Sequence, residues 1–154
     1  MAGSTTRSEP TSRDRPRREC PDRRVPSGSP AQHEVTHPWL AELLGGQDDV
    51  VVPDAVWVGF LRIVTHPNAL LQPSTLDEAA SFITDVVGAP AYLTAAPFTE
   101  SATRLVHLCR ESQASGNLVP DAYIASVALG YGCPVATFDR DFRRFDGLAI
   151  VTPR

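Results

Sequence analysis

From His33 to the carboxyl terminus, short apolar stretches alternate with longer stretches whose apolar residues repeat at helical spacing. Strands are predicted at residues 50–52, 91–94, 134–137 and 148–151. Helices are predicted at residues 33–44, 53–64, 76–87, 99–112 and 120–129. Strands that alternate with helices in this way are typical of a parallel sheet covered by helices on both faces. The sequence therefore predicts an α/β fold.

Local signals also predict where the helices begin and which faces they bury. Thr75 and Glu78 have the spacing of a capping box, and Pro38 and Pro120 suit the first turn of a helix. The predicted buried faces comprise Leu76, Ala80, Ile83 and Val87 in one helix and Ala102, Leu105, Val106 and Cys109 in the next. These apolar stripes are expected to pack on the sheet.

Residues 1–30 consist mainly of Arg, Pro, Ser and Thr, and beyond the first two residues Val25 is their only aliphatic residue. Neither a strand nor an amphipathic helix fits that composition, so this segment is predicted to be disordered. Residues 31–154 are long enough to bury one apolar core. The expected organisation is a disordered segment at 1–30 and one domain at 31–154.

The composition argues against several classes of function. Residues 31–154 contain seven Arg, no Lys and fourteen acids, which disfavours non-specific binding along a nucleic acid. The same excess of acids suits an enzyme whose carboxylates hold a metal ion. Three cysteines without a CxxC motif indicate a reducing environment, and no apolar run has the length of a signal peptide or membrane span. A soluble, cytoplasmic protein without a membrane partner is expected.

Polar groups gather in one stretch, Gly116 to Gly147, where apolar segments separate Asn117, Asp121, Thr137, Asp139 and Asp141. Asp139 directly follows a predicted strand, and ligands of parallel sheets lie beyond the carboxyl ends of the strands. Asp121 falls in the first turn of a predicted helix, where a carboxylate interacts favourably with the helix dipole. Whether that helix begins at the same edge of the sheet is left open by the sequence.

Converging carboxylates repel one another, and a divalent cation relieves that repulsion. Mg²⁺, or Mn²⁺ in its place, suits oxygen ligands and keeps waters that substrate phosphates can replace. In this interpretation Asp121 and Asp139 are metal ligands, and Asp141 is a further catalytic acid of the site. Thr137 orients the site or substrate, and Asn117 binds substrate.

A purely structural interpretation of the same acids stays open. Asp121 then serves only the helix dipole, Asp139 shapes a turn, and Asp141 pairs with Arg143 or Arg144. Spacing alone does not choose between the two interpretations.

Four stretches carry a family resemblance: HEVTHPWLAELL at 33–44, GFLRIVTHP at 59–67, GNLVPDAYIASVAL at 116–129 and VATFDRDFRRFDGL at 135–148. On these motifs the chain from about His33 resembles PIN-domain ribonuclease toxins of the VapC type, which are numerous in mycobacteria. The resemblance implies a three-layer fold with a short, mainly parallel sheet flanked by helices. It also implies Mg²⁺-dependent hydrolysis of RNA phosphodiester bonds, a VapB antitoxin as partner, and a homodimer.

Within this resemblance, Asp121 and Asp139 match metal-site acids of the family, and Asp141 matches a further acidic position. Arg62 is a candidate for binding the phosphates of the RNA substrate, as are Arg140, Arg143 and Arg144. Solvated surface charge is the alternative interpretation of these four arginines.

Two departures from the family pattern stand out. The family begins with a central apolar strand that carries an Asp, whereas Asp14 and Asp22 lie among Arg and Pro. The family also places a Glu where this chain has Gly59, although some subfamilies lack it; the nearby Asp54 is interpreted as a helix cap. The sheet is therefore expected to lack its first central strand, and residues 1–30 are hypothesised to be out of frame.

Two competing functions follow from other features. HEVTH at 33–37 matches the HExxH pattern of zinc hydrolases, but Pro38 disfavours helical geometry at His37 and no third ligand is evident. The stronger alternative is a catalytically impaired PIN-like module that binds antitoxin or RNA without cleaving it.

Overall fold

The structure is a computed structural model that describes residues 33–69, 72–96 and 101–154. Its helices are α1 (His33–Leu44), α2 (Asp54–Val64), α3 (Leu76–Val87), α4 (Ser101–Glu111) and α5 (Val119–Tyr131), with short 3₁₀ segments η2 (Gly116–Leu118) and η3 (Arg140–Arg144). Its strands are β1 (Val50–Val51), β2 (Tyr92–Leu93), β3 (Val135–Ala136) and β4 (Ile150–Val151). The nine predicted helices and strands are all present, each within two residues of its expected ends.

Two further expectations concern the amino-terminal segment and membrane-spanning helices. The disorder predicted for residues 1–30 lies outside the described residues. Among the helices that the structure does describe, none combines the length and apolar character needed to cross a membrane.

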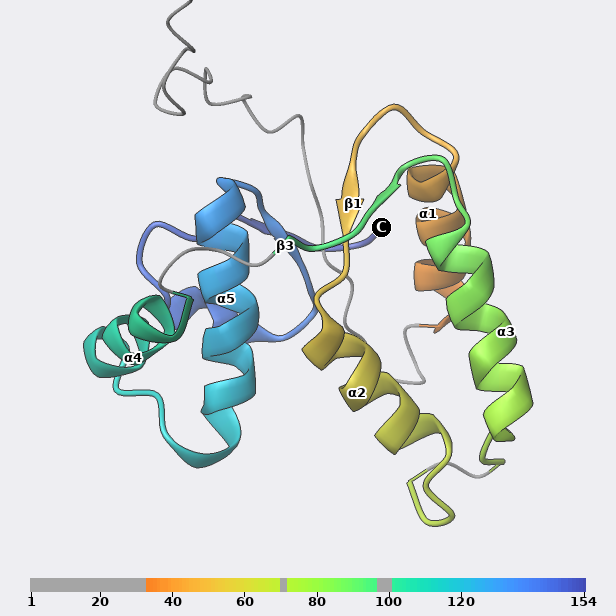
Figure 1. Ribbon diagram of the computed structural model, residues 1–154, viewed down its shortest axis with the longest axis horizontal. Coiled ribbons are helices and arrows are strands. Elements are labelled where there is room, and N and C mark those ends of the chain that lie inside the picture. Colours follow the sequence, from red (N-terminus) through yellow and green to blue (C-terminus); the bar gives the residue numbers. More distant parts are fainter. Residues whose placement is uncertain (1–32, 70–71, 97–100) are drawn as a thin grey trace, which may run out of the picture.

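The described strands form two separate sheets, each of two parallel strands. In the first, β1 pairs with β2, with Val50 opposite Tyr92. In the second, β3 pairs with β4, with Val135 opposite Ile150. Figure 1 shows α1 and α3 beside the first sheet and α4 and α5 beside the second. The α/β class and the parallel strand arrangement are confirmed, and no described strand connects the two sheets.

The apolar core is divided in the same way as the sheet. One cluster of buried residues is built on α4, α5, β3 and η3: Leu108, Ala114, Ala122, Ala125, Ala128, Cys133, Val135, Phe142 and Phe145. A smaller cluster surrounds β1: Leu43, Val50, Val52 and Ala91, with Trp39 and Trp57 among the side chains packed against it. Each two-stranded sheet thus has a core of its own.

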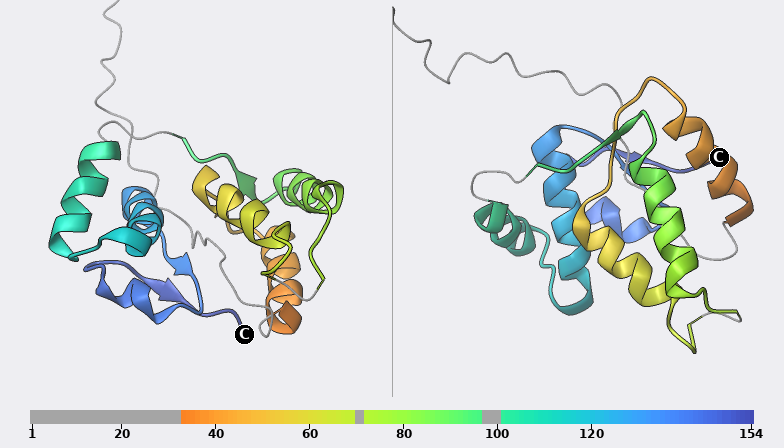
Figure 2. Two further views of the ribbon diagram at one scale, coloured as in Figure 1. Left: turned by 90° about the horizontal axis from the view of Figure 1, so that it is seen from below. Right: turned by 45° about the vertical axis from the view of Figure 1, so that its right-hand side comes forward.

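Helix α5 lies between the two halves, and its small residues allow close packing. Its buried residues are Ala122, Ala125, Ser126, Val127 and Ala128. A helix that is apolar on most sides belongs in an interior. Helix α5 contacts α4, β3 and η3 in one half and α2 in the other, an arrangement that the two views of Figure 2 make visible. It therefore joins the halves that the strands leave apart.

Helix α1 has its predicted bounds, but Pro38 lies further inside it than the sequence analysis expects. It runs from His33 with Pro38 inside it, so the predictions that Pro38 lies in the first turn and that His37 avoids helical geometry are wrong. Proline lacks an N–H and therefore removes the hydrogen bond to the carbonyl of residue 34. Because that carbonyl lies at the very start of the helix, only one intrahelical bond is lost.

The buried face of α3 also differs from the prediction. Ala79 and Val86 are 2% and 3% exposed, whereas Leu76 and Val87, which were expected to be buried, are 64% and 45% exposed. On an ideal helix these two faces are about a quarter turn apart. On the same helix, Phe82 packs on Phe60 of α2 with ring centroids 5.2 Å apart.

The predicted face of α4 is only partly correct. Leu108 is its buried residue, and Leu105 and Cys109 pack against the larger core cluster as expected. Val106 is 47% exposed, and Ala102 is exposed as well. Helix α4 therefore packs on α5 through residues 105, 108 and 109.

The capping box of α3 is confirmed and yields a first prediction. The Glu78 N–H donates to Thr75 Oγ1 at 3.2 Å, and the Thr75 N–H donates to Glu78 Oε2 at 2.7 Å. The bond from the Thr75 N–H, and after it a bond from the Thr75 hydroxyl to Glu78 Oε2 at 2.9 Å, also lower the pKa of Glu78. Thr75→Ala removes the cap and is expected to lower the free energy of unfolding by about 0.5–2 kcal/mol, measured by chemical denaturation.

Thr84→Ala is the matched control on the same helix. The Thr84 hydroxyl donates only to the Ala80 carbonyl, at 2.9 Å, on an exposed face. Alanine has the higher helix propensity, so no loss of stability is expected there. Equal losses in the two variants would show that the cap is not responsible.

Gly59 provides a second prediction, because nothing in its surroundings requires a glycine. It lies inside α2, and a Cβ added to it would meet no atom within 4 Å. Gly59→Ala is expected to raise the free energy of unfolding by about 0.5–1 kcal/mol. Gly132→Ala is the contrasting variant: its φ is 65° at the left-handed end of α5, so alanine should destabilise the protein there. Thermal denaturation of both variants tests the pair, and destabilisation by Gly59→Ala would contradict the prediction.

Candidate active site

The predicted acids come from the start of α5 and from the segment that follows β3. Asp121 lies in the first turn of α5, and β3 ends at Ala136, shortly before Asp139. Helix α5 contacts both β3 and η3. A helix that runs antiparallel to its strands begins where those strands end, so both groups belong to one edge of the sheet.

Hydrogen bonds fix the segment after β3. The Asp139 N–H donates to Thr137 Oγ1 at 2.9 Å, and Thr137 is buried. The Asp141 N–H donates in turn to Asp139 Oδ1 at 2.8 Å, so Asp139 caps η3. Arg144 lies 3.5 Å from the Asp141 carboxylate and also donates from Nε to the Asp141 carbonyl at 3.2 Å. The loop that presents these acids is therefore held by its own side chains.

The electrostatics of Asp121 show that the acids are neighbours. Partial burial raises the pKa of Asp121, and the negative charges of Asp139 and Asp141 raise it further. The positive charge of Arg144 acts in the opposite direction. The contacts of α5 with β3 and η3, together with the place of Asp121 in the first turn, put the start of α5 at the edge where β3 ends. This answers the question that the sequence left open.

This group of acids can bind a divalent cation, but it does not enclose one. Among the described residues, no three His, Cys, Asp or Glu side chains lie close enough together to form a metal cage. Mg²⁺ needs no such cage, because one or two protein carboxylates, waters and substrate phosphates usually complete its octahedral shell. Neighbouring carboxylates whose mutual repulsion raises a pKa are a suitable pair for that purpose.

The acids also perform the structural roles of the alternative interpretation. Asp121 lies in the first turn of α5, Asp139 caps a turn, and Asp141 pairs with Arg144. The two interpretations are compatible, since a carboxylate that receives one N–H bond still has lone pairs for a cation.

The remaining predicted site residues lie in different places. Asn117 is exposed in η2, directly before α5. Arg62 is exposed in the last turn of α2, and Arg140 and Arg143 are exposed in η3. Their contact with a substrate stays a prediction. Asp54 is the first residue of α2, after the N-cap residue Pro53, so it acts in the first turn of the helix and not as its cap.

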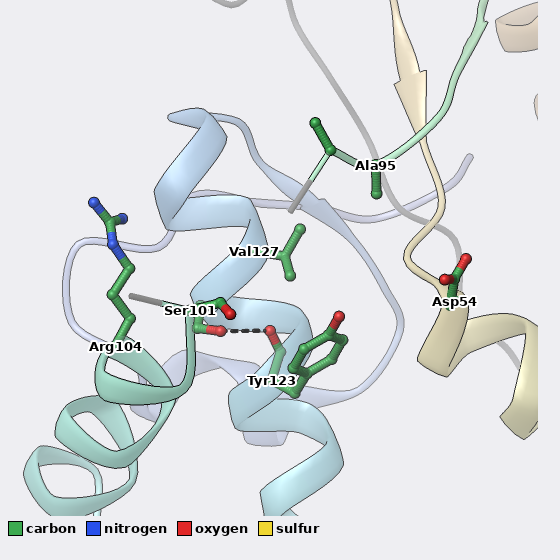
Figure 3. Close-up of a pocket in the computed structure, with 8 residues that line it drawn as sticks. Asp54, Ala95, Ser101, Arg104, Tyr123 and Val127 are labelled. Atoms are coloured by element: carbon green, nitrogen blue, oxygen red, sulfur yellow. Dashed lines mark hydrogen bonds between the residues drawn. The ribbon is translucent and has the colours of Figure 1, made fainter. Parts of the chain in front are cut away.

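A cavity of about 270 Å³ lies on another side of α5 (Figure 3). It is lined by Asp54, Ala95, Ala96, Ser101, Arg104, Tyr123, Ser126 and Val127. With about 3.6 residues per turn, the three residues that α5 contributes lie on a different face of the helix from Asp121. In Figure 3, Asp54 and Arg104 stand at opposite ends of the cavity, and the Ser126 hydroxyl donates to the Tyr123 carbonyl at 2.8 Å.

Sequence reasoning missed this cavity and the effect of Arg144 on the pKa of Asp121. The small residues between 122 and 128 predict close packing of the helix, and their sequence does not indicate a cavity beside it. Arg144 was a candidate both for binding RNA phosphates and, with Arg143, for pairing with Asp141. The structure shows the pair with Arg144, whose charge also acts to lower the pKa of Asp121. The spacing of three residues from Asp141 is the signal that points to this role.

A comparison with protein families agrees with this fold. The sequence pattern of the PIN domain matches residues 29–148, so the chain belongs to the PIN-domain family. Ribonuclease VapC31 of Mycobacterium tuberculosis is 37% identical over 126 residues, covering 82% of this chain and 89% of that protein. Ribonuclease VapC25 of the same species is 35% identical with the same coverage. Within the family, the chain is of the VapC type.

Solved structures share the fold at low sequence identity. VapBC2 from Rickettsia felis, bound to a DNA fragment from its promoter, gives a TM-score of 0.60 at 14% identity, covering 86% of this chain and 98% of that one. FitAB bound to the IR36 DNA fragment gives a TM-score of 0.55 at 18% identity, covering 85% and 94%. These similarities support the PIN fold independently of the sequence comparison.

The raised pKa of Asp121 yields a third prediction. The folded state binds a proton at Asp121 more readily than the unfolded state, whose pKa is about 3.9. The contribution of Asp121 to stability therefore falls as the pH rises through these two pKa values. Asp121→Asn is expected to stabilise the protein at pH 7 in EDTA, by at most about 1 kcal/mol because the carboxylate is partly exposed.

The gain should disappear near pH 3.5, where Asp121 is mostly protonated in both states. Chemical denaturation at the two pH values measures it. Asp85→Asn, which changes an exposed carboxylate of α3 away from the acids, serves as the control. A gain of equal size at both pH values would contradict the assignment to the charge of Asp121.

Proposed function

We propose that this protein is a Mg²⁺-dependent endoribonuclease toxin that hydrolyses RNA phosphodiester bonds and is restrained by a VapB-type antitoxin. The observation that carries the proposal is that α5, with Asp121 in its first turn, contacts β3 and also η3, the segment that carries Asp141 and is capped by Asp139. The negative charges of Asp139 and Asp141 accordingly raise the pKa of Asp121. Relatives at 35–37% identity over most of the chain are named ribonucleases.

In this proposal Asp121 and Asp139 hold the cation, with Mn²⁺ as a substitute for Mg²⁺. The bound cation supplies a water of lowered pKa and stabilises negative charge on the phosphate. Thr137 fixes the backbone of Asp139, and Arg144 holds Asp141 beside the pair. The protein's own contribution is thus to position two carboxylates and to keep a third negative group next to them.

The substrate is bound, in this proposal, by groups around the same edge of the molecule. Arg140 and Arg143 are exposed in η3, the segment that carries Asp141, and their cationic side chains suit RNA phosphates. Asn117 lies just before α5, where its amide can donate to the substrate. Arg62 is proposed as a further phosphate contact from the end of α2.

The proposed partner is a VapB-type antitoxin. Two solved structures with this fold are VapBC2 and FitAB, each bound to DNA. The relatives VapC31 and VapC25 carry the name of the toxin component. A homodimer is proposed on the same family grounds, and a cytoplasmic location would suit an RNA substrate.

A second candidate function is a PIN-like module that binds antitoxin or RNA without cleaving it. Gly59 offers no side chain at the position where the family places a Glu, and the space around it is open. The described residues also provide no group of three acids that encloses a metal. Both observations reduce the number of carboxylates available for catalysis.

Cleavage of a mixed single-stranded RNA, followed by gel electrophoresis, tests the proposed function. With Mg²⁺ the unmodified protein should cleave, and EDTA should abolish cleavage. Asp121→Asn and Asp139→Asn should each reduce the rate at least about a hundredfold, because each removes a ligand of the cation that would stabilise the negative charge of the transition state.

Asp146→Asn is the matched control, since Asp146 is an exposed acid just beyond η3 and is absent from the charges that act on Asp121. It should leave the rate within about threefold. RNA binding without cleavage by the unmodified protein would favour the binding module. Cleavage that survives both Asp121→Asn and Asp139→Asn would place the active site elsewhere.

A further inference from the structure

We propose that Arg144 is the counter-ion of the acids Asp121, Asp139 and Asp141 while no cation is bound, and that it weakens cation binding by competing for the same negative charge. The part of this proposal that concerns the cation rests on the function proposed above. The part that concerns Arg144 and the acids does not.

The backbone of Arg144 is held in place by two aromatic residues close to it in the chain. Phe142 and Phe145 are each 2% exposed, and their rings meet edge to face with centroids 5.9 Å apart. The Phe145 N–H also donates to the Phe142 carbonyl at 3.3 Å. Both rings belong to the larger core cluster, and η3 contacts α5. The Arg144 side chain therefore begins from a fixed point of the fold, close to the acids.

The Arg144 side chain contacts Asp141 at two points. Its Nε donates to the Asp141 carbonyl at 3.2 Å, and a terminal nitrogen lies 3.5 Å from the Asp141 carboxylate. Because the guanidinium is planar and rigid, the first contact orients the nitrogen that makes the second. The side chains of Arg144 and Asp141 are 34% and 56% exposed. An ion pair with this exposure contributes little to folding stability, so its main effect is on the charge of the site.

The charge of Arg144 also reaches the acid at the start of α5. Burial raises the pKa of Asp121 most, and the charges of Asp139 and Asp141 raise it further. The charge of Arg144 acts in the opposite direction. An ionised group of three carboxylates with one guanidinium has two net negative charges, which one divalent cation neutralises. Arg144 therefore reduces the repulsion among the acids and, for the same reason, their attraction for a cation.

Arg143 allows this local effect to be separated from the net charge of the protein. It carries the same charge one residue earlier and is exposed in η3. Among the described residues, no contact between Arg143 and the acids is observed, and its charge is not among those that act on Asp121. Loss of Arg143 or of Arg144 changes the net charge equally, but only the loss of Arg144 changes the charge beside the acids.

Titration of Mn²⁺ into the full 154-residue chain without RNA, followed by the electron paramagnetic resonance signal of free Mn²⁺, tests the proposal. The salt concentration is about 0.01 M, where charges act over about 30 Å. Arg144→Gln should lower the dissociation constant at least about threefold, because it removes a charge that repels the cation. Arg144→Lys, which keeps the charge and loses the planar guanidinium, and Arg143→Gln should each leave it within about twofold.

Tighter Mn²⁺ binding by Arg144→Gln alone supports the proposal. An unchanged or higher dissociation constant in Arg144→Gln overturns it, and so does equal tightening by Arg143→Gln, which would assign the effect to net charge. Absence of Mn²⁺ binding by the unmodified protein would contradict the proposed metal site, and with it the competition between Arg144 and the cation.

Thermal denaturation at pH 7 in EDTA tests the counter-ion role without a cation. Arg144→Gln should lower the melting temperature by about 1–3 °C, as expected for a partly exposed ion pair. The loss should be smaller when Asp121→Asn is also present, because one of the repelling charges is then absent. Equal losses with and without Asp121→Asn would overturn the counter-ion role. This comparison decides that role even if the unmodified protein neither binds Mn²⁺ nor cleaves RNA.

Discussion

Helix α5 contacts elements of both halves of the molecule, α4, β3 and η3 on one side and α2 on the other. Its alanines at 122, 125 and 128 are fully buried, so neighbouring elements approach its backbone closely. The first turn of the same helix carries Asp121. The position of the Asp121 carboxylate therefore depends on the packing of α5. A substitution that shifts this helix would change the distances between the carboxylates even though the carboxylates themselves are unchanged.

The elements of the fold could be predicted because their signals are local. Periodicity, the Thr75–Glu78 capping box and Gly132 after the last helical turn act within a few residues of chain. The buried faces of α3 and α4 could not be predicted equally well, since they depend on neighbours distant in sequence. Phe82 of α3 packs on Phe60 of α2, and the apolar stripe of one helix does not indicate which side chains of another helix it will meet.

The candidate site shows the same division. Asp139 could be placed at the end of a strand from sequence, and its place after β3 is a local property of the chain. The meeting of Asp121 with Asp139 and Asp141 depends on where α5 begins relative to the sheet, which is a property of the tertiary fold. The cavity beside Tyr123 and Ser126 likewise needs elements from three separate parts of the chain. The loop after β3 is held by hydrogen bonds of Thr137 and Asp139 and by the ion pair of Arg144 with Asp141. Asp139 and Asp141 therefore also stabilise the loop in which they lie.

The divided core has a consequence for how the molecule can be observed. Both tryptophans of the chain, Trp39 and Trp57, pack against the smaller cluster around β1. The larger cluster, on α4, α5 and β3, has no indole among its described members and contains Phe142 and Phe145 instead. Tryptophan emission therefore follows one half of the protein, while far-ultraviolet circular dichroism averages over the helices of both. Coincident unfolding curves from the two signals would mean that α5 couples the halves into a single cooperative unit.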